Sequence, residues 1–208
     1  MVSILKFVHC ESAEIFCFNI PAECPICGAD LSSRLRSPPI AIPTPFVNGT
    51  NIPCSVLVKP TVGGFLRDYK NGSNLHTGVS DSKGCIFNYD EDGMHLDTDS
   101  NSWKDSLAIP VVDLVDEELK DVWDKRLHSM ATQSSWQATR YHPDLHNCFD
   151  FVVNFLNCVE FNVWNEKSNE PITRTQFSTA YILPATSRAA RYIGLYRSIQ
   201  LHGSVTHK

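Results

Sequence analysis

One stretch near the middle of the chain constrains its fold more than any other. Two short segments with a strand pattern, residues 75–80 and 85–89, flank the turn Asp81-Ser82-Lys83-Gly84. Alternating runs on either side of a short loop that ends in glycine are typical of a β-hairpin. The sequence therefore predicts two adjacent antiparallel strands here.

The type of loop decides which side chains of this hairpin lie together. A type I turn followed by Gly84 in the left-handed conformation pairs Asp81 with Cys85. Counting outward then sets Gly78 opposite Asn88, so that His76 and Asn88 share one face of the sheet. Because Gly78 has no side chain, Asn88 can reach diagonally toward the imidazole. A two-residue loop would instead move Asn88 to the opposite face.

The rest of the chain mixes strand and helix patterns. Residues 4–8, 15–20, 54–58 and 107–115 are apolar runs bounded by turns, and five prolines between 38 and 53 favour an extended strap. Residues 116–130, 148–164, 174–182 and 187–201 have helical patterns. We expect an α+β fold, an antiparallel sheet packed against helices. Its expected parts are a Cys- and Pro-rich strand region, 1–60, and a main domain, 61–208.

Composition and charge exclude several classes of function. The 208 residues are 42% hydrophobic, enough for a core, and the net charge is −5 with no run of Lys or Arg. A nucleic-acid-binding surface is therefore not expected. The N-terminus lacks the apolar segment of a signal peptide, and no stretch has the length and apolarity of a transmembrane helix. We expect a soluble cytoplasmic protein, in which the eight cysteines serve as metal ligands, catalytic thiols or buried apolar residues. Its oligomeric state does not follow from these patterns.

Cys148 has the setting of a reactive thiol. It follows Asn147, a residue typical of helix N-caps, and opens the apolar segment that begins at residue 148. The free N–H groups and partial positive charge of a helix N-terminus stabilise a thiolate, and the same N–H groups can bind an oxyanion. Cys158, in the middle of the predicted helix, has none of these advantages. The alternative is that Cys148 is only a small buried apolar residue.

A second group of cysteines, near the N-terminus, has the spacing of a metal knuckle. In Cys24-Pro25-Ile26-Cys27-Gly28 the two-residue gap allows both thiolates to bind one tetrahedral Zn²⁺. We expect Cys10 as a third ligand and Cys54 as the fourth, with His9 as the alternative fourth ligand. The alternative is that this segment binds no metal and is a hairpin turn whose thiols stay reduced.

The segments around His76 and Cys148 resemble the circularly permuted papain-like superfamily, most of all its lecithin–retinol acyltransferase type. The matching segments are His76-Thr77-Gly78-Val79, Asn88, and Asn147-Cys148-Phe149-Asp150-Phe151-Val152. The resemblance implies a papain-like core with Cys148 as nucleophile, His76 as general base and acid, and Asn88 as the residue that orients His76. Phe149-Asp150 departs from the acyltransferase pattern, and Asn88 replaces a second histidine.

Most of the chain also resembles the makorin-two opposite-strand protein family. The segments that carry this resemblance are Phe7-Val8-His9-Cys10, Cys24-Pro25-Ile26-Cys27, Pro45-Phe46-Val47-Asn48-Gly49, Leu75-His76-Thr77-Gly78, Asn88-Tyr89 and His146-Asn147-Cys148. This resemblance supports the same fold and implies no particular substrate.

These observations lead to two hypotheses of different classes. The first is a thiol hydrolase or acyl transferase that needs no cofactor for catalysis and acts on a peptide, isopeptide, amide or ester carbonyl of a protein or lipid. The second is a binding or scaffold module that keeps the papain-like shell without turnover. His142 and His146 are nearer to Cys148 in sequence than His76, but we expect both to be solvent-facing loop residues.

Overall fold

The computed structural model describes residues 2–10, 13–32, 35, 37–110, 117–160 and 170–207. They form two compact units, one of Met1–Pro45 with Arg188–Lys208 and one of Phe46–Ser187. The division differs from the boundary expected at residue 60, because the last strand of the chain pairs with a strand near its beginning. The predicted α+β class, with antiparallel sheets and helices, is confirmed.

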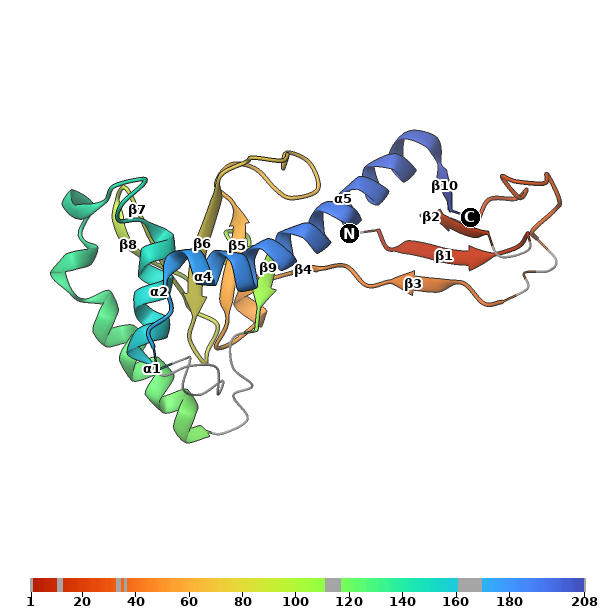
Figure 1. The fold of residues 1–208 in the computed structure, drawn as a ribbon. Coiled ribbons are helices and arrows are strands. Elements are labelled where there is room, and N and C mark those ends of the chain that lie inside the picture. The colour runs from red at the N-terminus through yellow and green to blue at the C-terminus, as the bar shows by residue number, and fades with distance from the viewer. Residues whose placement is uncertain are drawn as a thin grey trace. The chain divides into compact units, whose positions relative to one another are not determined.

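The first unit is a four-stranded antiparallel sheet in the order β10-β2-β1-β3 (Figure 1). Its strands are β1 (Ile4–Val8), β2 (Glu14–Cys17), β3 (Ile40–Ile42) and β10 (Ser204–His207). Phe7, Ile15 and Cys17 form a small core with Cys24 and Leu31 of the loop that follows β2. This loop therefore covers one face of the sheet.

Helix α5 (Leu183–His202) packs on the sheet of this unit. Phe18, just after β2, contacts Tyr196 of α5 with ring centroids 4.8 Å apart. Its residues Ala189, Ile193 and Ile199 are buried. The helix ends at His202, and at the following Gly203 φ is +79° and the N–H donates to the Ile199 carbonyl.

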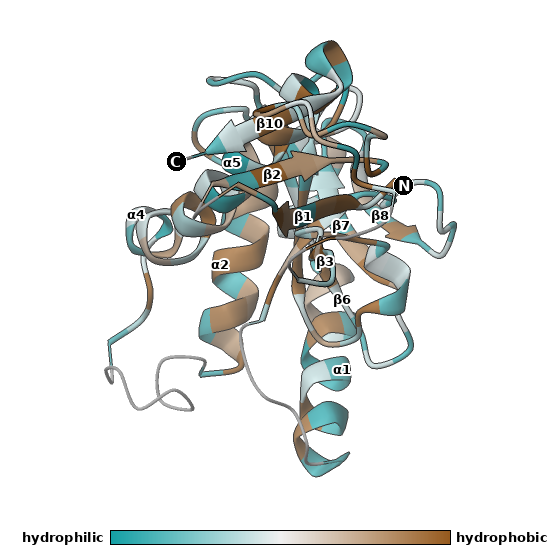
Figure 2. Ribbon diagram, turned by 90° about the vertical axis from the view of Figure 1, so that its right-hand side faces the viewer, coloured by the Kyte–Doolittle hydropathy of each residue, from teal (hydrophilic) through white to brown (hydrophobic). Residues whose placement is uncertain are grey.

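The second unit contains a six-stranded antiparallel sheet in the order β4-β9-β5-β6-β7-β8. Helix α2, which is largely apolar (Figure 2), packs on β6 and β7, and α1 packs on α2 through Trp123 and Phe155. The sheet strands are β4 (Phe46–Val47), β5 (Val56–Pro60), β6 (Leu75–Ser80), β7 (Ile86–Asp90), β8 (Gly93–Asp97) and β9 (Ser106–Ile109). The α-helices are α1 (Glu117–Ala131), α2 (Cys148–Cys158) and α4 (Arg174–Phe177), with 3₁₀ turns η1 (Gly49–Asn51), η2 (Ser134–Trp136) and η3 (Ala138–Arg140) and the π-helical turn η4 (Ser178–Ile182).

Most predicted elements are found, with shifted ends. The bounds predicted for β1 and β6 are confirmed, and α1 differs from its prediction by one residue at each end. The predicted strand 107–115 is found as β9, and its part beyond 110 lies outside the described residues. The predicted helix 148–164 is found as α2, and 161–169 are likewise not described. None of the helices described has the length and apolarity needed to cross a membrane.

The hairpin of β6 and β7 has the predicted three-residue loop. The Asp81 N–H donates to the Cys85 carbonyl at 2.9 Å, and Gly84 has φ +82°. Gly78 pairs with Asn88, as counted from this turn. A side chain at position 84 would be strained in this conformation, and its Cβ would lie 2.1 Å from the Thr50 carbonyl oxygen.

We expect Gly84→Ala to lower the free energy of unfolding by about 3 kcal/mol, from backbone strain and the clash together. Urea denaturation followed by tryptophan fluorescence measures the effect. Gly64→Ala is the matched control, because a Cβ there meets no atom within 4 Å, and its effect should stay within about 0.5 kcal/mol. Equal midpoints for both variants would contradict the assigned turn.

Candidate functional site

The predicted His76 and Asn88 meet on the second unit's sheet. His76 lies on β6 and Asn88 on β7, and the register of the hairpin puts both on one face. His76 Nε2 and Asn88 Oδ1 are 2.9 Å apart. Gly78, on the same face, leaves no space for a side chain, because a Cβ at that position would lie 2.9 Å from both Trp103 and Ile86.

Cys148 is the first residue of helix α2, which begins as the sequence predicts. The Asn147 side chain accepts a hydrogen bond from the Phe149 N–H, and Asp150 accepts one from the Asn147 N–H. This capping box leaves Cys148 in the first turn, where the helix dipole favours a negative charge. Asp150, a departure from the acyltransferase pattern, thus fixes the start of the helix. It also contacts Arg174 at 3.3 Å.

The thiol of Cys148 and the imidazole of His76 interact directly. Burial opposes ionisation of Cys148, which is 5% exposed, but the hydrogen bond and charge of His76 lower the pKa of the thiol below its ordinary value. Burial also opposes the charged form of His76, yet its hydrogen bond to Cys148 and the opposite charge raise its pKa overall. The contact therefore stabilises the thiolate and the imidazolium relative to the same two charged groups held apart.

Thr77 is a neighbour of the sulfur that sequence analysis did not single out. Its backbone N–H and its hydroxyl both lower the pKa of Cys148. The side chain is fully buried, and the hydroxyl has no oxygen or nitrogen partner among the described residues. A buried hydroxyl without such a partner is costly, and the sulfur of Cys148 is the group beside it that the hydroxyl stabilises in its charged form.

Asp97 fixes the orientation of Asn88. The Asn88 Nδ2 donates to Asp97 Oδ2 at 3.0 Å, and an ionised carboxylate can only accept. Asn88 must therefore turn its carbonyl oxygen toward His76, so His76 Nε2 carries a proton and donates to it. In the neutral ring this leaves the Nδ1 lone pair free to receive the thiol proton.

Asp97 lies on β8, a strand that sequence analysis missed. The signal was available, because Asp92-Gly93 is a typical hairpin dipeptide and begins two residues after the end of β7. The β7–β8 pairing sets His95 opposite Asn88 and places Asp97 two residues farther along β8. His95 itself contacts Asp90 at 2.7 Å instead.

Trp103 and Lys59 complete the surroundings of the imidazole. The fully buried Trp103 donates its indole N–H to Asp97 at 2.8 Å and lies against the His76 ring, with centroids 5.7 Å apart. Lys59 Nζ lies 4.5 Å from the Trp103 ring centroid and donates to the Ser102 carbonyl. Burial lowers the pKa of Lys59, and the charge of Asp97 opposes this shift.

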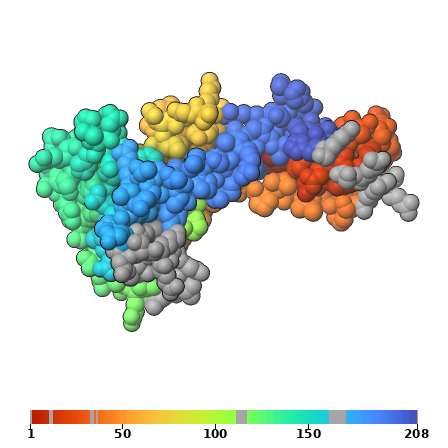
Figure 3. Space-filling model, in the orientation of Figure 1, coloured from red at the N-terminus to blue at the C-terminus, as the bar shows by residue number. Residues whose placement is uncertain are grey.

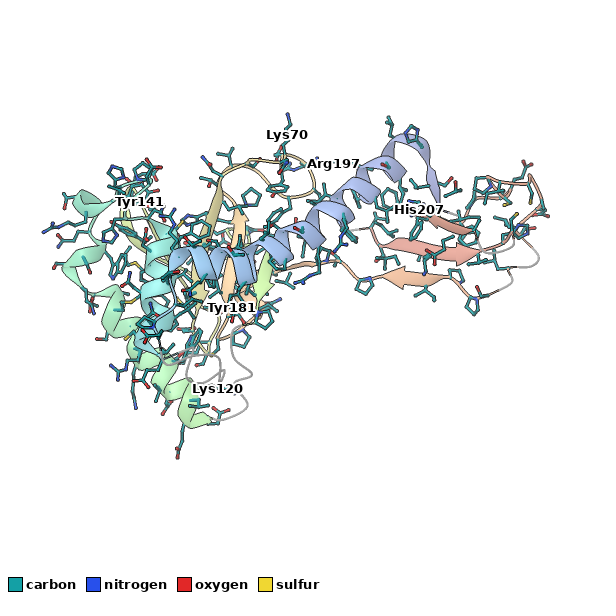
Figure 4. All side chains as sticks on the ribbon, in the orientation of Figure 1. Lys70, Lys120, Tyr141, Tyr181, Arg197 and His207 are labelled. Carbon is teal, nitrogen blue, oxygen red and sulfur yellow. The ribbon has the colours of Figure 1, made fainter. Side chains whose placement is uncertain are left out.

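The stretch before α2 supplies an aromatic cluster near the thiol. Tyr141, beside the β7–β8 hairpin in Figure 4, has its pKa raised by burial and by the charge of Cys148. His146 packs against Trp136 and Tyr89, so the expectation that it faces solvent was wrong. Its Nδ1 is buried without a partner among the described residues. His142 is exposed, as expected.

The N-terminal cysteines form a group that could hold a metal ion, with one correction to the predicted set. His9, Cys10, Cys24 and Cys27 place their ligand atoms within 4.8 Å of one another. Cys54 is not in this group: it lies just before β5 in the second unit, where burial raises its pKa to about 11. His9 is the fourth member of the group in place of Cys54. Since β1 ends at Val8, the next two residues, His9 and Cys10, both lie beside the knuckle.

The three thiols of this group differ in their acidity. Burial opposes ionisation of Cys24, but the backbone N–H groups of Cys27 and Ile26 help to lower its pKa to about 6. The hydrogen bond to Cys27, together with burial, raises the pKa of Cys10 to about 12. The group therefore titrates as a coupled set, not as independent thiols.

The pKa shifts at Cys148 predict a distinct pH profile for its alkylation. In the native protein, we expect iodoacetamide to react with Cys148 at lower pH than with an ordinary thiol, because the thiolate persists until the pH falls through its lowered pKa. In His76→Ala the profile should move to higher pH. Peptide mapping by mass spectrometry follows Cys148 separately, with the exposed Cys158 as an internal reference. Identical profiles in both proteins would contradict the interaction.

Comparisons with known proteins identify the family. The profile of DUF4796 C-terminal matches residues 39–199, and that of DUF4796 N-terminal matches residues 2–31. The human MKRN2 opposite strand protein is 36% identical over 202 residues, which cover 97% of this chain and 87% of that protein. The resemblance to the makorin-two opposite-strand family is thereby confirmed, and no solved structure matches the chain. The chain belongs to the DUF4796 family.

Proposed function

We propose that the protein is a cysteine hydrolase or acyl transferase that uses Cys148 and His76. The observation that carries this proposal is the contact of a helix-N-terminal thiol with an imidazole whose other nitrogen is held 2.9 Å from Asn88. Nucleophile, base and orienting group in this order are the arrangement that thiol catalysis needs. No cofactor takes part in the proposed reaction.

The proposed reaction proceeds through a thioester. The Cys148 thiolate attacks the carbonyl carbon of the substrate, a C–S bond forms, and the carbonyl electrons move to oxygen. When the tetrahedral intermediate collapses, His76 gives its proton to the leaving group. Water or another acceptor then attacks the thioester and passes its proton to His76, and Cys148 leaves as thiolate.

Several groups in this unit suit that reaction. The N–H groups at the start of α2 suit the developing oxyanion, and Thr77 and the helix dipole stabilise the thiolate between cycles. The order of histidine strand before cysteine helix, with α2 packed on β6, supports a circularly permuted papain-like core. Since Asp150 caps α2, its departure from the acyltransferase pattern leaves the thiol site intact.

The substrate is an ester, amide, peptide or isopeptide of a protein or lipid, and the reaction is placed in the cytoplasm. All eight cysteines are free thiols, which suits a reducing compartment. The alternative is a binding module without turnover. In such a module, no carbonyl substrate would acylate Cys148.

The activated ester p-nitrophenyl acetate tests the chemistry. We expect an adduct of about 42 Da on Cys148 and release of p-nitrophenol, falling by about 10²–10⁴ in His76→Ala. Cys148→Ala should lose both signals, and Cys158→Ser, an exposed thiol at the other end of α2, should keep them. Acetylation elsewhere, or equal hydrolysis by Cys148→Ala, would refute the proposal. A folded protein with no adduct would favour the binding module.

We also infer that the group of His9, Cys10, Cys24 and Cys27 is a structural zinc site. With Zn–S of about 2.3 Å and Zn–N of about 2.0–2.1 Å, a tetrahedron has S···S edges of about 3.8 Å and S···N edges of about 3.5 Å. Cys10 Sγ is 3.7 Å from Cys24 Sγ, and His9 Nδ1 is 3.4 Å from Cys10 Sγ and 3.6 Å from Cys27 Sγ. These distances fit the edges of one such tetrahedron.

Mass spectrometry under native conditions tests the zinc site. The protein refolded with zinc should carry about 65 Da of extra mass, and removal of the metal should lower its melting temperature. His9→Ala and Cys10→Ser should lose the zinc, whereas Cys54→Ser should retain it. Loss of zinc from Cys54→Ser, or its retention in Cys10→Ser, would refute the assigned ligand set.

A further inference from the structure

An apolar groove in the first unit has no part in either proposal. It has a volume of about 750 Å³, within the range of roughly 300–1,000 Å³ typical of ligand sites. It lies between the part of α5 that begins at Arg188, the segment around Pro43 and Pro45, and the end of β10, and all its lining residues belong to the first unit. The apolar lining comes from Ile42, Pro43, Pro45, Tyr192, Leu195 and Val205.

The groove lies on the face of the sheet that α5 covers. His207 of β10, labelled in Figure 4, stacks on Phe16 with centroids 5.2 Å apart, and Phe18 on the same face contacts α5. The knuckle loop covers the opposite face. The groove and the zinc group are therefore on opposite sides of one sheet.

The charge along the groove has a single sign. Arg188 and Arg191 both line it and are exposed on α5, whose outer side is drawn in blue in Figure 3. Neither forms an ion pair with any acidic residue in the described part of the chain. Among the residues that the structure describes, no Asp or Glu lines the groove. Two guanidinium groups without an ion-pair partner in the described part of the chain, beside an apolar channel, favour a ligand that has an anionic head group and a hydrocarbon chain.

The polar groups of the lining argue against a peptide. The Tyr192 hydroxyl is hydrogen-bonded to Thr44, so these two side chains already satisfy each other. A peptide backbone laid along aliphatic side chains would leave N–H and C=O groups without partners, at a cost that a chain of methylenes avoids. A nucleic acid is disfavoured by only two lining arginines and a net charge of −5.

We propose that this groove binds a free single-chain aliphatic carboxylate, with the chain along Leu195, Ile42 and Val205 and the carboxylate at Arg188 and Arg191. The binding stands apart from the thiol chemistry, since none of the lining residues belongs to the second unit. Loss of one activity therefore leaves the other intact, and the two proposals can fail separately.

Titration calorimetry with dodecanoate below its micellar concentration tests the groove in the full-length protein. We expect saturable binding at one site, at least about tenfold weaker in Arg188→Glu/Arg191→Glu, because each charge-assisted contact is lost and reversed. Leu195→Asp should weaken it similarly by placing a charge in the channel. Arg126→Glu, on an exposed position of α1 in the second unit, is the matched control and should bind as the native protein does.

Two further probes separate the head group from the chain. Dodecyltrimethylammonium, with the same chain and opposite charge, should bind at least about tenfold more weakly than dodecanoate, and acetate should not bind measurably. The proposal is overturned by equal binding of the two amphiphiles, by binding to anionic vesicles without any binding of monomeric dodecanoate, or by an equal loss in Arg126→Glu. Circular dichroism melting of each variant ensures that weaker binding is measured on folded protein.

Discussion

The pairing of Gly78 with Asn88 across the β6–β7 hairpin is the constraint on which the candidate thiol site depends. A shift of one residue would send Asn88 to the opposite face and leave His76 without its partner. The three-residue loop fixes this register, and Gly84 permits the loop because its φ is +82°. Chemistry at Cys148 thus rests on backbone geometry at a turn that itself contains no reactive group.

The charged groups of the site are largely buried, and each lies close to other charged or hydrogen-bonding groups. The thiol of Cys148 faces His76, and neutral Asn88 separates His76 from Asp97. Lys59 pairs with His76 across β5 and β6, and its Nζ lies over the Trp103 ring. Each charge thereby has an opposite charge or a donor nearby, which limits the cost of removing it from water. The same chain of contacts determines the protonated nitrogen of His76, so Asp97 influences the thiol without touching it.

The sequence predicted those parts of the site that depend on local rules. Turn chemistry was enough to pair Gly78 with Asn88, and N-cap preference was enough to place Cys148 at the start of α2. Asp97 was missed because β8 was not recognised, and Cys54 was chosen over His9 because spacing along the chain does not reveal which segment ends beside the knuckle. The division into two units depends on contacts of the same kind, because the pairing of β10 with β2 joins residues that are far apart in sequence.

That long-range pairing has consequences for how the first unit is held together. Its sheet needs both ends of the chain, and the whole second unit is inserted between them. Closing such a loop costs conformational entropy before any contact across it forms. The four proposed zinc ligands, by contrast, all lie between residues 9 and 27, so the metal can join β1 to the knuckle before β10 docks. A small core of Phe7, Ile15 and Cys17 gains most from such a local cross-link, because small units bury too little apolar surface to be stable alone.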